Sequence, residues 1–394
     1  MFDRLPKPQP DGILAVMAAF RADPRGDKVD LGVGVYKDAA GRTPVMRAVK
    51  AAEARLVAEQ DTKTYTQLAG DPAFHAAMAG LILGDGVPAA RLAAAAATGG
   101  TGAVRLTFDL IRAANPAARL WISWPTWPNH ITIADAVGLA WSPYRWLDPE
   151  AGALDRAGLM ADLAQAQPGD VVVLHGCCHN PTGVDMDLSD WAAVADLCET
   201  RGLIPMVDIA YQGFGAGLEG DAAGLRLLAA RLPRVIVAAS GAKNFGMYRE
   251  RVGIAFVLAP EAEREVVQAT LAALNRAAIS FPPDHGARVV TTILTDPALR
   301  ADWAAELEAM RARIEGLRRM LAEALRAETG SDRMGFVAAQ RGMFSTLPLS
   351  PGQVARLAAE HGVYAVGGGR VNMAGLTETN VPLVARALAA VLRD

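Results

Sequence analysis

The chain has 394 residues, of which 52% are hydrophobic and 21% are charged, a composition typical of a globular protein long enough for two domains. Its formal net charge of −3 at pH 7 argues against a protein that binds nucleic acid through a basic surface. No stretch approaches the roughly eighteen uninterrupted apolar residues of a membrane-spanning helix, and the first residues do not resemble a signal peptide, so we expect a cytoplasmic protein.

The three cysteines, Cys177, Cys178 and Cys198, cannot all pair, and adjacent cysteines rarely bridge each other, so a disulfide framework is not expected. Two of them lie in the segment 175–179 (His-Gly-Cys-Cys-His), whose residue types can bind a metal. The spacing matches no common zinc pattern, and the sequence has no second cysteine pair to complete four ligands. We therefore interpret this segment as the end of a buried strand and predict no metal site.

The amino-terminal part of the chain predicts an arm, a helix and a strand. Segment 6–10 holds three prolines, which prevent a helix and favour an extended arm. A helix is expected over 12–21, and a strand-like run follows over 30–36. This run contains Gly32 and Gly34, and glycines within a strand indicate either a bulge or a place where the backbone closely approaches another group.

The next helical pattern covers residues 45–60, and a glycine-rich segment at 97–103 (Ala-Thr-Gly-Gly-Thr-Gly-Ala) opens another helix that should reach about Ala114. The first turn of such a helix leaves backbone N–H groups free to bind an anion. By itself the segment is a weak signal. It lacks the Gly-Lys-Ser/Thr ending of a P-loop and the GxGxxG spacing of a dinucleotide-binding turn.

An alternation of apolar runs and helical segments follows. The apolar runs cover 120–122, 171–174, 203–207 and 235–237. A helix over 187–201 lies between the second and third runs and should end at Gly202. Short apolar runs separated by helices predict an α/β fold with a mostly parallel sheet covered on both faces. Sites in such sheets lie beyond the carboxyl ends of the strands.

Polar and aromatic residues follow each of these four strands and should therefore meet at one edge of the sheet. In chain order they are Trp127 and His130, then Asn180, then Asp208 and Tyr211, and finally Ser240 and Lys243.

Lys243 differs from the other cations of this part of the chain, because every other cationic position after residue 63 is an arginine. A guanidinium stays protonated and cannot form an imine, whereas a buried ammonium loses its proton readily. The hydroxyl of Ser240 and the guanidinium of Arg251 are suited to hold a phosphate near this amine. We therefore interpret Lys243 as a Schiff-base nucleophile rather than as a surface lysine in a turn.

The segment 240–253 (Ser-x-x-Lys-Asn-Phe-Gly-x-Tyr-x-Glu-Arg-x-Gly) resembles the lysine signature of the aspartate and aromatic-amino-acid aminotransferases, pyridoxal-phosphate enzymes of fold type I. Asn-Pro-Thr-Gly at 180–183, Asp-x-x-Tyr at 208–211 and Arg-Val-Asn at 370–372 extend this resemblance over essentially the whole chain. The family's usual second serine before the lysine is Ala242 here. Other segments look most like the bacterial aromatic-amino-acid aminotransferases.

The resemblance implies a large domain with a mostly parallel seven-stranded sheet flanked by helices, and a smaller α+β domain built from both ends of the chain. We assign residues 1–44 to an amino-terminal arm and part of the small domain. Residues 45–299 form the large cofactor-binding domain, and residues 300–394 form a linking helix and the rest of the small domain.

The apolar residues of the linking helix recur at steps of three and four over 300–328, and a coiled coil is the competing interpretation. The remaining expected elements are strands at 335–337, 343–345 and 364–366, a helix at 352–361, and a closing helix from about Val381.

The resemblance also implies the cofactor, pyridoxal 5′-phosphate, and the residues that contact its ring. A buried Asp208 would keep the ring nitrogen protonated, with His130 behind it. Tyr211 and Asn180 fit hydrogen bonds to the phenolic oxygen, and Trp127 would stack on the ring face.

The cofactor's phosphate would be held by Gly100, Thr101, Ser240 and Arg251, and the resemblance implies that Tyr65 reaches it from the partner chain of a homodimer. The amine of Lys243 would also move the proton during the reaction, which makes Lys243, Asp208 and Tyr211 the catalytic residues.

For the substrate, the resemblance implies that Arg370 clamps the α-carboxylate. Arg276 of the other subunit would bind the distal end of a dicarboxylate, while Gly34 and Phe344, together with Trp127 and Asn180, would border the substrate. Asp284 stands where an apolar residue is expected, and the sequence offers no account of it.

The predicted function is an aminotransferase that moves the amino group between Tyr, Phe, Trp or a dicarboxylic amino acid and 2-oxoglutarate by a ping-pong mechanism. Aspartate aminotransferase as the main activity is the alternative. A pyridoxal-phosphate-binding regulator would need a basic DNA-binding domain, for which we expect no room in 394 residues. A lyase or decarboxylase would keep the lysine and the aspartate but needs no second half-reaction.

Overall fold

The computed structural model describes residues 2–5 and 12–393 and divides into two compact units. The smaller unit comprises Met1–Thr43 and Ile314–Asp394, and the larger unit comprises Pro44–Arg313. The extended arm predicted at Pro6, Pro8 and Pro10 lies outside the described residues.

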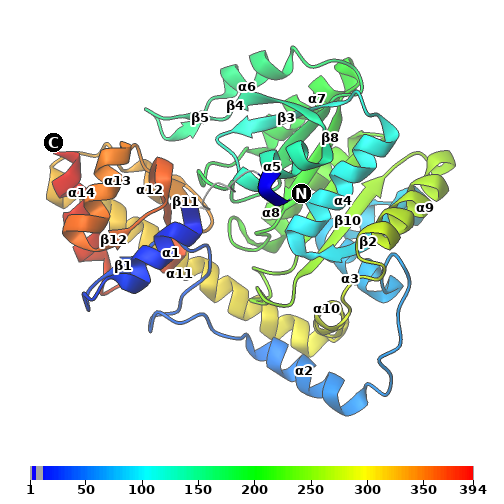
Figure 1. Ribbon diagram of the computed structural model, residues 1–394, viewed down its shortest axis with the longest axis horizontal. Helices are drawn as coiled ribbons and strands as arrows, with labels where there is room; N and C mark the ends of the chain where they lie inside the picture. Colours follow the sequence, from blue (N-terminus) through cyan, green and yellow to red (C-terminus); the bar gives the residue numbers. More distant parts are fainter. Residues whose placement is uncertain (1, 6–11, 394) are drawn as a thin grey trace. The chain divides into compact units, whose positions relative to one another are not determined.

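The larger unit is built around a seven-stranded sheet with the strand order β2-β10-β9-β8-β7-β3-β4 (Figure 1). Its strands are β2 (Leu92–Thr98), β3 (Arg119–Trp124), β4 (Ala140–Arg145), β7 (Val171–His175), β8 (Ile204–Ile209), β9 (Val235–Ser240) and β10 (Val252–Leu258). Neighbouring strands are parallel except where β10 pairs antiparallel with β9 and β2. The predicted fold class and the four predicted strands are confirmed.

The edge strand β2 is the least expected element, because its sequence is Leu-Ala-Ala-Ala-Ala-Ala-Thr and alanine is the best helix former. It nevertheless pairs with β10 along its whole length, from Leu92 opposite Leu258 to Thr98 opposite Val252. Its five alanines are buried, so pairing and burial decide its conformation rather than local propensity.

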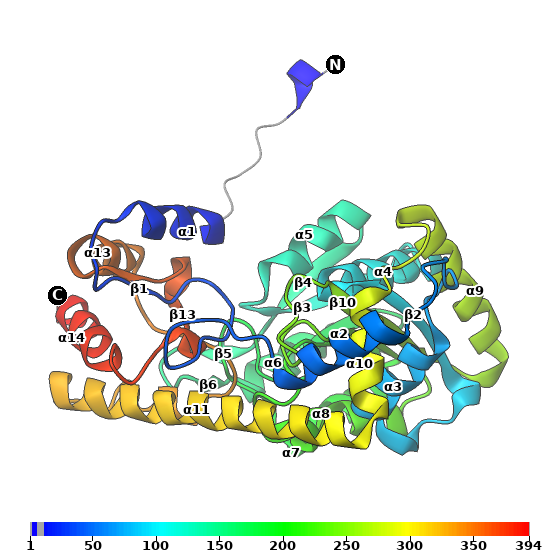
Figure 2. The same ribbon diagram turned by 90° about the horizontal axis from the view of Figure 1, so that it is seen from below.

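Helices cover both faces of this sheet, with α4 and α5 on one side and α7 and α8 on the other in Figure 2. One face packs against α4 (Gly99–Ala114), α5 (Pro128–Val137) and α9 (Glu261–Ala278). The other helices of this unit are α2 (Arg47–Glu59), α3 (Pro72–Ile82), α6 (Arg156–Leu163), α7 (Leu188–Arg201), α8 (Gly217–Arg231) and α10 (His285–Thr295), and a short hairpin joins β5 (Leu147–Asp148) to β6 (Ala153–Leu154).

The predicted ends of α7 are confirmed. The carboxylate of Asp187 accepts hydrogen bonds from the backbone N–H groups of Ser189 and Asp190, which caps the first turn. The helix ends at Gly202, whose φ of 66° lies in the left-handed region.

The smaller unit combines segments from both ends of the chain. Its helices are α1 (Gly12–Ala22), α12 (Phe336–Ala339), α13 (Pro351–His361) and α14 (Val381–Leu392). Two small sheets complete it: β1 (Val29–Asp30) runs parallel to β12 (Val363–Tyr364), and β11 (Phe344–Thr346) runs antiparallel to β13 (Arg370–Asn372).

Three strand predictions in this unit are wrong in whole or in part. Segment 335–337 is not a strand, because turn hydrogen bonds around Asp332 and Gly335 lead into the short helix α12. The strand predicted over 30–36 ends at Asp30, whose carboxylate accepts the N–H of Gly32 and turns the chain. The strand predicted over 364–366 is confined to β12.

Helix α11 (Pro297–Thr329) is continuous (yellow in Figure 2), and the predicted helix over 300–328 is confirmed. Its apolar stripe is buried within this chain, so a coiled-coil partner is not needed to explain it. Trp303, for example, stacks on Phe245 at 4.5 Å between ring centroids and donates to the carbonyl oxygen of Asn244 at 2.8 Å. Among the described residues, none of the helices combines the length and the apolar character needed to cross a bilayer.

Candidate active site

A pocket lies where the carboxyl ends of β7, β8 and β9 meet the amino end of α4. Nine of the residues predicted from the sequence line it: Gly100, Thr101, Trp127, Asn180, Asp208, Tyr211, Ser240, Lys243 and Arg251. His175, Cys177 and Ala210 also line it. These residues are spread over more than half of the larger unit in sequence, and they meet beyond the ends of the parallel strands, where sites in such sheets are expected.

One end of the pocket is suited to an anion. Arg251 lies so close to the amino end of α4 that a Cβ atom on Gly99 would be 2.6 Å from its Nη2 atom. Ser240 also lies there, because a Cβ atom on Gly100 would be 3.1 Å from its Cβ atom. The hydroxyl of Ser240 accepts the N–H of Ala242 at 3.1 Å and donates to a backbone carbonyl oxygen of β10 at 3.5 Å. A guanidinium, a hydroxyl and the first N–H groups of a helix together favour a phosphate.

Lys243 lies on the turn that follows β9, and its amine faces the pocket. Its Nζ atom lies 5.1 Å from the centroid of the Tyr211 ring. Burial lowers the pKa of Lys243; the carboxylate of Asp208 opposes this shift, and the charge of Arg251 adds to it. The amine of Lys243 therefore loses its proton more readily than that of an ordinary surface lysine, and the neutral amine is the nucleophilic form.

Asp208 lies near the end of β8 and is only 9% exposed. Burial alone would raise its pKa, but the hydrogen bond from His130 and the nearby basic groups of His130, His175 and Lys243 lower the pKa below its usual value. The His130 Nε2 atom lies 3.0 Å from Oδ2 of Asp208. The carboxylate is therefore ionised inside the protein.

Two buried oxygen atoms in this pocket have no hydrogen-bond partner among the described residues. They are Oδ1 of Asp208 and Oδ1 of Asn180. Buried polar atoms in folded proteins are nearly always hydrogen-bonded, so this pair indicates a ligand with polar atoms of its own at this position.

Sequence reasoning placed His130 behind Asp208 but missed the hydrogen-bonded chain that continues from His130. The hydroxyl of Thr126 lies 2.9 Å from Nδ1 of His130 and 3.2 Å from Nε2 of His175. His175 ends β7 directly opposite Asp208 on β8. Strand register is the signal that could have found it, since neighbouring parallel strands that end together bring their last side chains together.

The second histidine of this segment, His179, is fully buried. Its ring nitrogens lie 3.0 Å from the hydroxyl of Ser123 and 2.9 Å from that of Thr182, and its ring stacks on Trp146 with centroids 4.4 Å apart. The interpretation of 175–179 as the end of a buried strand agrees with this geometry.

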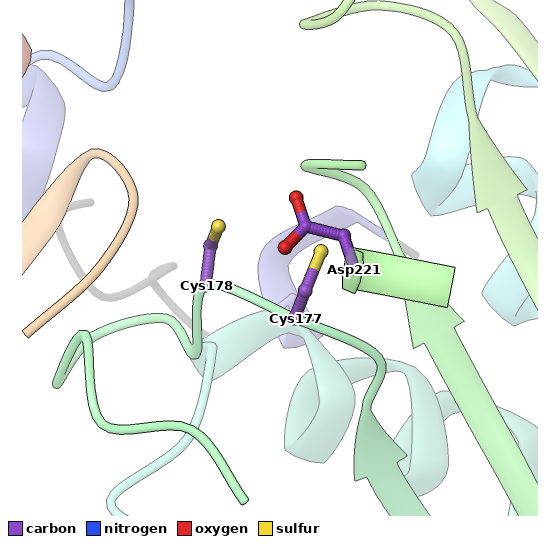
Figure 3. A group of neighbouring side chains, drawn as sticks. All are labelled: Cys177, Cys178 and Asp221. Atoms are coloured by element: carbon purple, nitrogen blue, oxygen red, sulfur yellow. The ribbon is translucent and has the colours of Figure 1, made fainter. Parts of the chain in front are cut away.

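The two adjacent cysteines lie beside an aspartate that the sequence did not connect with them (Figure 3). The sulfur atoms of Cys177 and Cys178 and a carboxylate oxygen of Asp221 all lie within 4.8 Å of one another. Burial, reinforced by the neighbouring thiol and carboxylates, raises the pKa of Cys177 and keeps its thiol protonated. Asp221 accepts three backbone N–H groups of residues 213–216 at 2.6 to 2.9 Å, so we interpret it as the anchor of that loop.

In the smaller unit, the structure brings together Gly34, Phe344 and Arg370. The Arg370 side chain is 7% exposed, and its Nη2 atom donates to the carbonyl oxygen of Gly32 at 2.8 Å. Its Cζ atom lies 4.7 Å from the centroid of the Phe344 ring. A Cβ atom on Gly34 would lie 2.7 Å from the Cζ atom of Phe344, so the predicted close approach at this glycine is to that ring.

Tyr65 and Arg276 are not among the described residues that line the pocket. Both are exposed and share one neighbour: the Tyr65 ring stacks on Phe281 at 4.7 Å, and the Cζ atom of Arg276 lies 5.8 Å from the same ring centroid. Arg276 also donates to the hydroxyl of Ser280 at 2.5 Å. Asp284 is half-buried before α10, where burial raises the pKa of its carboxyl. Nothing in the structure explains Asp284.

The comparisons with known proteins agree over nearly the whole chain. The family model described as "Aminotransferase class I and II" matches residues 26–388. An aromatic-amino-acid aminotransferase of Paracoccus denitrificans is 55% identical over 384 residues, which cover 97% of this chain and 98% of the relative. An aspartate aminotransferase of Salmonella typhi is 44% identical over 396 residues and 100% of both chains.

A solved structure is also similar. The aromatic-amino-acid aminotransferase from Burkholderia pseudomallei, covalently bound to pyridoxal phosphate, has a TM-score of 0.97 at 42% identity and covers 100% of this chain and 99% of that chain. The chain belongs to the family of class I and II aminotransferases.

Proposed function

We propose that this protein is a pyridoxal-phosphate-dependent aminotransferase that moves the amino group between an aromatic or dicarboxylic amino acid and 2-oxoglutarate. The observation that carries the proposal is one pocket that holds a partly buried amine, an ionised buried carboxylate and a group suited to an anion, at Lys243, Asp208 and Arg251 respectively. The name of the Paracoccus relative and the cofactor of the Burkholderia structure support it.

The residues of the pocket fit the cofactor. When bound, pyridoxal 5′-phosphate supplies an aldehyde and an electron-withdrawing ring that stabilises negative charge on the substrate's α-carbon. The anion site formed by Ser240, Arg251 and the first turn of α4, which includes Gly100 and Thr101, would hold its phosphate. The unpaired Oδ1 of Asp208 would accept a hydrogen bond from the protonated ring nitrogen.

Three further side chains would orient the ring. Trp127 would pack on its face, while Asn180 and Tyr211 would hydrogen-bond its phenolic oxygen and so favour the ionised form of that oxygen. The ionised Asp208, held by His130, would keep the positive charge on the ring nitrogen.

Lys243 would serve twice. Its lowered pKa suits covalent attachment to the cofactor's aldehyde, and the same amine, once released, would accept the proton from the substrate's α-carbon. Proton transfer by a positioned base is worth about 10²- to 10⁴-fold in rate.

Arg370 would bind the substrate's α-carboxylate, with Phe344 and Gly34 beside it. Residues 45–299 would form the cofactor-binding domain, and the pocket lies wholly within the larger unit, Pro44–Arg313. Tyr65 and Arg276 would act in the partner's pocket of a homodimer, as their exposed positions permit. A cytoplasmic location stays a prediction from the sequence.

Aspartate aminotransferase is the second candidate for the main activity. The exposed guanidinium of Arg276 favours it, because a second cation suits a dicarboxylate. The Salmonella relative carries that name, at lower identity than the Paracoccus relative. Initial rates with phenylalanine, tyrosine and aspartate against 2-oxoglutarate separate the two candidates, since a main activity with aspartate would replace the aromatic assignment.

The proposal is tested at Lys243. Borohydride reduction of the cofactor-loaded protein should trap the cofactor on Lys243, and Lys243→Ala should lower turnover more than about a hundredfold while still binding the cofactor non-covalently. Lys50→Ala, at an exposed lysine of α2, is the matched control and should keep full activity. Normal turnover in Lys243→Ala would overturn the proposal.

A lyase is distinguished from an aminotransferase by the cofactor's absorbance. Glutamate alone should convert the cofactor to its amine form, and 2-oxoglutarate should reverse the change. Loss of the substrate's carboxylate or side chain without this reversible change would point to a lyase.

A further inference from the structure

Arg318 is the most deeply buried cation in the described part of the chain. It lies on α11 within the smaller unit, and its side chain is 1% exposed. Burying a guanidinium is costly unless its N–H groups are hydrogen-bonded. A cation placed there therefore indicates a specific set of acceptors rather than general packing.

The acceptors of Arg318 belong mainly to one short segment, residues 337–345. Its Nη2 atom donates to the carbonyl oxygen of Phe344 at 2.6 Å and to that of Gly342 at 2.8 Å. Its Nη1 atom donates to the carbonyl oxygen of Val337 at 3.0 Å and to the hydroxyl of Ser345 at 2.7 Å. The guanidinium thus donates hydrogen bonds to several carbonyl groups of a segment that includes the start of β11.

The hydroxyl of Ser345 extends this arrangement. It accepts from Arg318 and donates to the Oε1 atom of Gln340 at 2.6 Å, and all three side chains are buried. Both ends of the 340–345 turn are therefore fixed to the same guanidinium, directly or through one hydroxyl.

The fixed segment supports the predicted carboxylate site. Strand β11 pairs with β13, with Thr346 opposite Arg370 and Phe344 opposite Asn372. The ring of Phe344 lies close to both Gly34 and the guanidinium of Arg370. A displacement of the Phe344 backbone would therefore move the ring on which the Arg370 side chain rests.

We propose that Arg318 is a positioning residue for carboxylate binding: by holding the backbone of Phe344 it fixes the ring that orients Arg370 toward the substrate's carboxylate. The proposal rests on the carboxylate-binding role proposed for Arg370. It assigns Arg318 no contact with the substrate or the cofactor.

The test uses the binding of 3-phenylpropionate to the cofactor-loaded protein, measured by titration calorimetry, because this ligand carries the carboxylate but cannot react. Arg318→Met should raise its Kd by about ten- to a hundredfold, as expected when a binding group is misplaced by about an ångström. Arg318→Lys retains a donor for the carbonyl oxygen of Phe344 and should give an intermediate Kd. For phenylalanine, KM should rise more than kcat falls.

Two controls separate positioning from general damage. Arg326→Met removes an exposed arginine from the same helix and should leave the Kd unchanged. Inorganic phosphate binding to the cofactor-free protein reports on the larger unit and should be the same in every variant. The proposal would be overturned if a folded Arg318→Met protein bound 3-phenylpropionate with the wild-type Kd. It would also be overturned if that variant lost affinity for phosphate by the same factor as for 3-phenylpropionate.

A milder variant keeps the test decisive if Arg318→Met does not fold. Ser345→Ala removes one acceptor of Arg318 and should raise the Kd by a smaller factor than Arg318→Lys. Wild-type Kd values in both Arg318→Lys and Ser345→Ala would then reject the positioning role. Failure of the proposed function is distinct, because it would appear as a wild-type protein that binds 3-phenylpropionate but does not transaminate.

Discussion

Two of the three histidines near Asp208 are neutral because they are buried. Burial lowers the pKa of His175 well below its usual value; the nearby imidazoles of His179 and His130 add to this shift, and the carboxylate of Asp208 opposes it. Burial, with the charge of His130, does the same for His179. The chain from Asp208 through His130 and Thr126 thus ends in a neutral imidazole, and the carboxylate keeps its negative charge.

These depressed pKa values predict that stability falls as the pH decreases below about 6.5, the usual pKa of histidine. In the unfolded chain both imidazoles take up protons in that range, whereas in the folded protein they do not. The unfolded state then binds more protons, and each histidine lowers the free energy of unfolding by up to about 1.4 kcal/mol per pH unit. Urea unfolding of the cofactor-free protein between about pH 8 and pH 5 measures the slope.

The control for this prediction is His179→Gln, which retains polar atoms for Ser123 and Thr182 but cannot titrate. Its stability should fall less steeply with decreasing pH than that of the wild-type protein. Equal slopes in the two proteins would show that the buried imidazoles do not govern the acid sensitivity.

The contact between α4 and β10 shapes the proposed anion site. Gly253 of β10 lies against the start of α4 so closely that a Cβ atom there would be 2.3 Å from the carbonyl oxygen of Gly99. The obstructing atom belongs to the backbone, so a side chain cannot be accommodated by a rotamer change. The helix can supply its N–H groups beside Arg251 and Ser240 only while residue 253 is glycine.

We therefore expect Gly253→Ala to push the first turn of α4 away from β10. The affinity of the cofactor-free protein for inorganic phosphate should fall at least about tenfold, because anion binding depends on the placement of those N–H groups. Gly316→Ala is the control, because a Cβ atom added at this position on α11 would meet nothing within 4 Å. That variant should keep its phosphate affinity and gain roughly 0.5 to 1 kcal/mol in stability. An unchanged phosphate affinity in Gly253→Ala would contradict this view of the site.

The elements that can be predicted from sequence are those whose local pattern agrees with their environment. The apolar runs of β7 and β9 are buried on both faces, and the residues that cap and end α7 are the usual ones. Strand β2 escapes prediction because its alanines favour a helix, and pairing with β10 outweighs that preference. Segment 335–337 has Phe and Val side chains typical of a strand, although turn hydrogen bonds start a helix there.

The position of the pocket residues at one edge of the sheet is also predictable from the sequence. Asn180 and Lys243 follow parallel strands and Asp208 lies near the end of another, and the ends of such strands meet at one edge of the sheet. The supporting contacts of Asp221 and Arg318 are not predictable, because each depends on backbone groups of a loop whose path local sequence does not determine.

At the scale of the whole molecule, the proposed homodimer with shared sites makes a testable claim about which chain supplies each residue. Lys243→Ala and Arg276→Asp should each be nearly inactive with aspartate. A hybrid of the two has one site with both changes and one with neither, so mixing and reassociating the variants should restore up to about a quarter of the wild-type activity. Turnover of aspartate and sedimentation equilibrium measure the outcome.

The matched control mixes Lys243→Ala with Asp208→Ala, since Lys243 and Asp208 line the same pocket of one chain. In that hybrid each site carries one change, and activity should stay low. A monomer, or no recovery in the first mixture, would contradict the shared-site assignment.

The pairing of Val29 with Val363 in the smaller unit has a consequence for synthesis on the ribosome. The larger unit is one continuous stretch, Pro44–Arg313, and can fold once it has emerged, as domains generally do during translation. Val29 must instead wait until Val363 has been synthesised before the two can pair. Until then the apolar side chains of Val29 and Leu31, which are buried in the folded protein, stay exposed and can bind chaperones.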